Sequence, residues 1–152
     1  MKIFIDTNIF LDLLLERANY EDALVILNSI EANLFEGVVL DITLLNIDYV
    51  ARKQVKDIRT FLRLINDMFE VVGANNKSVL EALYLKNSDF EDNLQYICAK
   101  ESAAECIISN DKEFLNPTSS SKKRKAQHIG FKQLLKKTTC TTSSLLIVSL
   151  FV

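Results

Sequence analysis

Short runs of β-branched and aromatic residues alternate along this chain with longer segments in which apolar residues recur at helical spacing. Strands separated by helices form βα units, and right-handed crossovers place the helices on both faces of a mainly parallel sheet. The pattern therefore predicts a three-layer α/β/α fold around a central sheet of four to five strands. The predicted strands are residues 2–5, 37–42, 69–73, 106–109 and 127–129, and the predicted helices are residues 9–16, 20–32, 43–53, 57–67, 77–85, 89–100 and 131–137.

The composition fits a single folded domain in a reducing compartment. The chain has 152 residues, of which 49% are hydrophobic and 25% charged, enough to bury a real core. Its three cysteines, Cys98, Cys106 and Cys140, have no regular spacing and are expected to be small hydrophobic residues rather than a disulfide framework. No apolar stretch is long enough to span a bilayer, and no signal peptide is recognised. We therefore expect a cytoplasmic protein with no membrane partner.

Charge is unevenly distributed between the two parts of the chain. Residues 1–115 hold all 20 acidic residues and 11 of the 18 Lys and Arg, a net charge of −9, whereas residues 116–152 hold the other 7 basic residues and no acid, a net charge of +7. Acids on the surface of the body and a solvated basic tail explain this best, although a metal site and a phosphate-binding arm would also fit. The predicted domain is residues 1–137. Residues 138–152 are predicted to be a C-terminal tail, which could be foreign or frameshifted sequence.

Acidic residues stand where strands are predicted to end. Asp6 follows the first strand, and Asn110 and Asp111 follow the fourth, whereas Asp92 lies in a helix whose expected cap is Asp89. Ligands bind at the carboxyl ends of parallel strands, so these carboxylates could gather in one cleft, where Mg²⁺ or Mn²⁺ would hold them together. Taken singly, each acid is better explained as a cap or a turn. Asp41 is predicted to lie within the second strand, and Asn76 to cap the helix 77–85.

Two segments resemble the signatures of PIN-domain ribonucleases, a family that includes VapC-type toxins. The stretch "IFIDTNIFLDLLLER" resembles the opening motif of that family. The stretch "DFEDNLQYICAKESAAECIISNDKEF" resembles its second signature, an acidic helix followed by a strand with a Ser/Thr-x-Asp-x-x-Phe tip. The resemblance covers roughly residues 1–135 and implies a PIN-like fold.

The resemblance also implies a set of site residues. Asp6, Asp92 and Asp111 match the first, third and fourth metal-site acids of the family. Asn46 stands at the second position, where the family usually has Glu, so an amide oxygen would replace a carboxylate there. The positions expected to support the site are Asn8, Asp89, Ser109 and Asn110.

The function implied by the resemblance is metal-dependent hydrolysis of RNA phosphodiester bonds by an endoribonuclease that uses Mg²⁺ or Mn²⁺. Such a protein would be the toxin of a type II toxin–antitoxin pair, with RNA as substrate and an antitoxin protein or a second copy of the chain as partner. Asn46 leaves an alternative open, a PIN-fold module that binds RNA or protein with weak or lost catalysis.

A basic run in the sequence offers a site for RNA phosphates. The run consists of Lys122, Lys123, Arg124 and Lys125. A solvated loop is the more common explanation of such a run. A haloacid-dehalogenase-type phosphoryl transfer domain is disfavoured, because Asp6-Thr7-Asn8 lacks the Asp-x-Asp that such a domain needs after its first strand.

Overall fold

A central parallel sheet organises the computed structural model, which describes residues 1–110 and 127–128. Its five strands lie in the order β3-β2-β1-β4-β5, and every neighbouring pair is parallel. The predicted parallel sheet is confirmed, and so is its fifth strand. The strands are β1 Lys2–Ile5, β2 Glu36–Leu40, β3 Phe69–Val72, β4 Cys106–Ile108 and β5 Gln127–His128.

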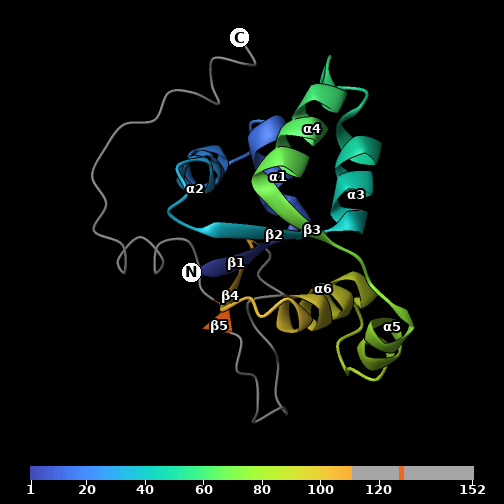
Figure 1. Cartoon of the computed structure of the whole chain (residues 1–152). Helices are drawn as coiled ribbons and strands as arrows, with labels where there is room; N and C mark the ends of the chain where they lie inside the picture. Colours follow the sequence, from blue (N-terminus) through green and yellow to red (C-terminus); the bar gives the residue numbers. More distant parts are fainter. Residues whose placement is uncertain (111–126, 129–152) are drawn as a thin grey trace.

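Helices cover both faces of this sheet, as Figure 1 shows. Helices α1 to α4 lie on one face, and α5 and α6 lie on the other (Figure 1), which confirms the three-layer α/β/α architecture. None of the helices within the described residues has the length and apolar character needed to cross a membrane. Their bounds are α1 Thr7–Leu14, α2 Tyr20–Glu31, α3 Asp41–Ala51, α4 Ile58–Met68, α5 Asn76–Leu83 and α6 Phe90–Glu101.

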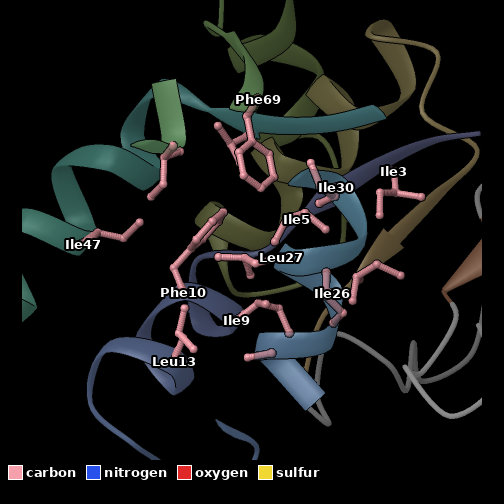
Figure 2. Packing of buried hydrophobic residues seen from close by; sticks show 14 of the residues in the cluster. Ile3, Ile5, Ile9, Phe10, Leu13, Ile26, Leu27, Ile30, Ile47 and Phe69 are labelled. Carbon is pink, nitrogen blue, oxygen red and sulfur yellow. The ribbon is translucent and has the colours of Figure 1, made fainter. Parts of the chain in front are cut away.

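The central strands are buried on both faces because helices cover both sides of the sheet, and successive side chains point to opposite sides. Ile3 and Ile5 of β1 pack beneath helices α1 to α4, whereas Phe4 between them packs against α6. In the larger core cluster, on the face covered by α1 to α4, Phe10 of α1 makes edge-to-face contact with Phe69 of β3. The ring centroids are 5.4 Å apart (Figure 2). Burial of these side chains fixes the strand register, and with it the positions of the residues that follow each strand.

A close approach between two strands explains one glycine. A Cβ atom added at Gly37 of β2 would lie 2.5 Å from the ring of Phe69, which is the neighbouring residue in the β3 register. The lack of a side chain at Gly37 therefore lets the Phe69 ring lie over β2 in the core.

The structure corrects two local predictions from the sequence and confirms a third. Asp41 is not in a strand, because β2 ends at Leu40 and Asp41 begins α3, where its Oδ1 accepts a hydrogen bond from the Ile42 backbone N–H at 2.8 Å. Asn75, not Asn76, caps α5, and its Oδ1 accepts hydrogen bonds from two backbone N–H groups of the first turn. Cys98 and Cys106 are buried and free, as expected. Cys140, the predicted helix 131–137 and the predicted tail 138–152 lie outside the described residues.

Candidate active site

Asp6 lies at the carboxyl end of β1, where the central strand meets α1. Its side chain is 4% exposed. Its Oδ2 accepts a hydrogen bond from the Ser109 hydroxyl at 2.6 Å and a longer one from Asn8 Nδ2 at 3.4 Å, while Oδ1 accepts one from Gln95 Nε2 at 3.2 Å. The Asp6 backbone N–H donates to the Ile108 carbonyl at 3.0 Å. Residues from α1, α6 and the end of β4 therefore meet at this one carboxylate.

Helix capping does not explain Asp6. The residue occupies the N-cap position of α1, yet its side chain makes no capping hydrogen bond. Burial raises the pKa of the Asp6 carboxyl above its ordinary value, and hydrogen bonds from Ser109 and Gln95 offset that rise only in part. The backbone N–H of Asn8 lies close enough to lower the pKa, by less than Ser109 or Gln95 does, but without the geometry of a capping hydrogen bond. Asp6 is therefore a desolvated carboxylate held by groups from other parts of the chain.

Glu91 supplies a second carboxylate to the same cluster. Its Oε1 accepts hydrogen bonds from Asn46 Nδ2 at 2.9 Å, from the Thr7 hydroxyl at 3.2 Å and from Gln95 Nε2 at 3.3 Å. Gln95 lies one helical turn after Glu91 on α6, and its amide group donates to both Glu91 and Asp6. The two acids therefore share a donor, and residues of α1, α3 and α6 meet at Glu91.

A neighbouring polar contact fixes the segment that leaves β4. Asn110 Nδ2 donates to Oδ2 of the buried Asp12 at 2.8 Å. The same carboxylate accepts a hydrogen bond from Asn19 Nδ2 at 3.2 Å, and the Arg17 guanidinium lies 4.0 Å away. Asp12 thus ties the chain just beyond Ser109 to helix α1, next to Asp6.

The structure brings four of the predicted site residues into one network, namely Asp6, Asn8, Asn46 and Ser109. Asn110 lies at its edge, bound to Asp12.

Two further predicted acids, Asp89 and Asp92, stand at the start of α6. Asp89 caps α6, as expected, by accepting a hydrogen bond from the Asp92 backbone N–H at 3.2 Å. Asp92 is half-buried in the first turn of α6, one residue beyond Glu91. Its role as a metal-site acid stays a prediction. Asp111 and the basic run Lys122, Lys123, Arg124 and Lys125 lie outside the described residues.

Two members of the network were missed from the sequence, Glu91 and Gln95. Neighbouring residues on a helix point about 100° apart, so the choice between Glu91 and Asp92 depends on the exact start of α6. Gln95 lies between Leu94 and Tyr96 in α6, and the local sequence does not indicate a partner 89 positions earlier. The i, i+4 spacing of Glu91 and Gln95 was the available signal.

The donor atoms of this cluster fit a hard divalent cation. Asp6 and Glu91 supply carboxylates, and no Lys or Arg within the described residues forms an ion pair with either. Gln95 Oε1 is buried without a hydrogen-bond partner. An all-oxygen set of this kind suits Mg²⁺ or Mn²⁺. Within residues 1–110 and 127–128, however, no three acidic, His or Cys side chains form a group that could hold a metal ion.

A protein-family model and one curated protein match this chain. A family model for the PIN domain matches residues 2–113. The chain is 29% identical over 123 residues to Ribonuclease VapC1 of Aquifex aeolicus (strain VF5), and the match covers 76% of this chain and 85% of that protein.

Three solved structures share the fold. VapBC2 from Rickettsia felis, bound to a DNA fragment from its promoter, matches with a TM-score of 0.60 at 18% identity. The match covers 86% of this chain and 98% of the Rickettsia felis chain. A toxin–antitoxin complex from Klebsiella pneumoniae has a TM-score of 0.60 at 20% identity, with 76% and 92% covered. PAE2754 from Pyrobaculum aerophilum has a TM-score of 0.56 at 18% identity, with 90% and 88% covered. The match of the family model to most of the chain establishes that this protein belongs to the PIN domain family.

Proposed function

We propose that this PIN-domain protein is a divalent-cation-dependent endoribonuclease that hydrolyses RNA phosphodiester bonds and serves as the toxin of a type II toxin–antitoxin pair. The relative from Aquifex aeolicus is named as a ribonuclease, and two of the structures that share the fold are toxin–antitoxin or VapBC assemblies. Identity to those structures is low, so they support the fold, and the activity rests on the site itself.

The observation that carries the proposal is the pairing of Asp6 with Glu91. Both acids lie beyond the carboxyl ends of parallel strands, where α/β folds bind ligands. Burial makes an uncompensated negative charge unfavourable, and a cation placed between two carboxylates removes that penalty. Asp92 and Asp111, as the sequence predicts, would complete the acidic set.

The described residues orient the acids rather than attack the substrate. Ser109 and Gln95 hold the two oxygens of Asp6, and Thr7 and Asn46 hold one oxygen of Glu91. The Thr7 and Ser109 hydroxyls both donate to carboxylates, and we assign them the role of orienting these acids. A divalent cation bound here would polarise a phosphoryl oxygen and neutralise charge that develops on the leaving oxygen.

Removal and return of the cation tests the proposal. Protein stripped with EDTA should leave a single-stranded RNA pool intact, and Mg²⁺ or Mn²⁺ added in excess should restore cleavage. The two ions assayed in parallel also decide which is preferred. Cleavage that persists undiminished in EDTA would contradict cation dependence, and no cleavage with either ion would favour a binding function.

A second candidate function follows from Asn46. In the structure Asn46 donates its amide to Glu91 instead of adding a negative charge, which favours a PIN-fold module that binds RNA or protein with weak or lost catalysis. Asn46→Glu separates the two. If the position serves the cation, the new carboxylate should tighten Mn²⁺ binding, and a weaker site would show that Asn46 does not serve the cation.

The basic run Lys122, Lys123, Arg124 and Lys125 remains our proposal for a contact with RNA phosphates. Replacement of all four residues by Ala should weaken binding of every RNA sequence to a similar degree and make binding less dependent on salt. Unchanged affinity and salt dependence would assign the run to a solvated loop.

A further inference from the structure

Gln95 occupies an unusual position between the two acids. Its side chain is 1% exposed. Nε2 donates to Asp6 Oδ1 at 3.2 Å and to Glu91 Oε1 at 3.3 Å, so one amide nitrogen, which carries two protons, serves two carboxylates. Gln95 is thus the group that directly joins Asp6 to Glu91 within the described residues.

The orientation of this amide follows from charge. Rotation by 180° would bring the carbonyl oxygen of Gln95 against two carboxylate oxygens, which repel it. The observed orientation avoids that contact, although it leaves Gln95 Oε1 buried without a hydrogen-bond partner. A buried polar atom left unpaired is unfavourable. The two hydrogen bonds to Asp6 and Glu91 therefore contribute more free energy than the unpaired Gln95 Oε1 costs.

We propose that Gln95 is a positioning residue that bridges Asp6 and Glu91 in the cation-free protein and competes with the divalent cation for the same two oxygens. The inference rests on the proposed cation site. Partial positive charge on the Gln95 amide holds the two carboxylates together when no ion is present. A cation that binds Asp6 Oδ1 and Glu91 Oε1 has to displace that amide, so its apparent affinity is lower than the carboxylates alone would give.

The test compares two changes at Gln95 with one elsewhere on α6. Gln95→Met keeps the length of the side chain and removes both donors, and Gln95→Asn keeps an amide that is too short to bridge. Asn93→Ala is the matched control, because Asn93 is also buried and donates a hydrogen bond, to the Asn87 carbonyl at 2.9 Å, but has no hydrogen bond to Asp6 or Glu91. Mn²⁺ affinity is measured by calorimetry on EDTA-stripped protein, and Tm is measured with and without Mn²⁺.

Both Gln95 variants should bind Mn²⁺ more tightly than the wild type, Gln95→Met by about tenfold, since the ion no longer displaces two hydrogen bonds to charged oxygens. Their Tm in EDTA should fall, and Mn²⁺ should raise it by more than it raises that of the wild type. Asn93→Ala should lower Tm in EDTA and leave Mn²⁺ affinity unchanged.

Weaker or unchanged Mn²⁺ binding in the two Gln95 variants would overturn the competition, provided that the wild type binds the ion. If the wild type binds no Mn²⁺ at millimolar concentration, the proposed cation site fails, and this inference fails with it. The two failures are therefore distinguishable in one titration series.

Discussion

Asp57 and Asp6 each occupy the position just before a helix, yet the pKa values of their carboxyl groups are shifted in opposite directions. The Asp57 side chain accepts hydrogen bonds from the Thr60 hydroxyl at 2.7 Å and the Thr60 backbone N–H at 3.2 Å, and so caps α4. These bonds lower the pKa of the exposed Asp57 carboxyl. Asp6 is buried and makes no capping bond to α1, and burial raises its pKa.

The difference teaches that the role of an acid at a helix start is set by its long-range partners. Asp57 finds its donors three residues away, so α4 alone decides its conformation. Asp6 finds Gln95 and Ser109 at positions 89 and 103 residues distant, so only the assembled sheet can orient it. Local capping stabilises a helix, whereas burial of a carboxylate costs stability, which our proposal attributes to a cation-binding role for Asp6.

The largest effect should appear in RNA cleavage. We expect Asp6→Asn to reduce the cleavage rate by about 100-fold or more, because it removes a charged oxygen from the proposed cation site. Asp57→Asn, the matched change at a capping acid, should cleave RNA at the wild-type rate. Full activity in Asp6→Asn would remove the distinction between the two acids, as would equal losses in both.

The second-largest effect should be on Mn²⁺ affinity, when Glu91 is changed. Glu91→Gln keeps the shape of the side chain and removes its charge, and we expect Mn²⁺ to bind about tenfold more weakly. Asp92→Asn, measured beside it, shows whether the acid predicted from the sequence also serves the cation. If calorimetry finds the same Mn²⁺ affinity for Glu91→Gln and the wild type, Glu91 does not bind the cation, and Asp92 remains the candidate for the third metal-site acid.

A smaller, opposite effect should appear in stability without a cation. Because the pKa of Asp6 is raised in the folded protein, its contribution to stability is present at acidic pH and is lost as pH rises through that raised pKa. Asp6→Asn removes this loss and should raise the urea midpoint of the cation-free protein at pH 7. The gain should shrink as pH falls toward the ordinary range of an aspartate. Urea unfolding in EDTA measures both, and destabilisation at pH 7 would show that charge burial at Asp6 carries no penalty.

The smallest effect should come from the capping acid. The pKa of Asp57 is lowered, so its contribution is present above the ordinary pKa of an aspartate and is lost as pH falls through the lowered value. Asp57→Ala should slightly lower the urea midpoint at pH 7, by less than Asp6→Asn raises it, and the loss should fade at acidic pH. A pH-independent loss would mean that the charge of Asp57 plays no part in the cap.

Much of the fold could be predicted because its signals are local. The run from Lys2 to Ile5 is a strand in both pattern and structure, and Tyr20–Glu31 follows its helical spacing to within one residue. Asp6 could be placed because strand ends meet at one edge of a parallel sheet, whereas Ser109 was expected only from the resemblance to the PIN-domain signature. Asp41 was misplaced because α3 begins directly after Leu40, at a point where the apolar pattern of the sequence continued the strand.

The rest of the site depends on helix phase and on long-range contacts. The cap at Asp89 fixes where α6 starts, and that start turns Glu91 toward Asn46 and Thr7. Gln95 was missed because a buried amide is recognisable only once its two acceptors are assembled around it.

Titration of EDTA-stripped protein with Mn²⁺, for the wild type and for Asp6→Asn at neutral pH, tests the central claim most directly. The account predicts saturable binding by the wild type at millimolar Mn²⁺ or below, and loss of that binding in Asp6→Asn, with Asp57→Asn indistinguishable from the wild type. Equal binding heats for the wild type and Asp6→Asn would contradict the claim that Asp6 forms part of a cation site.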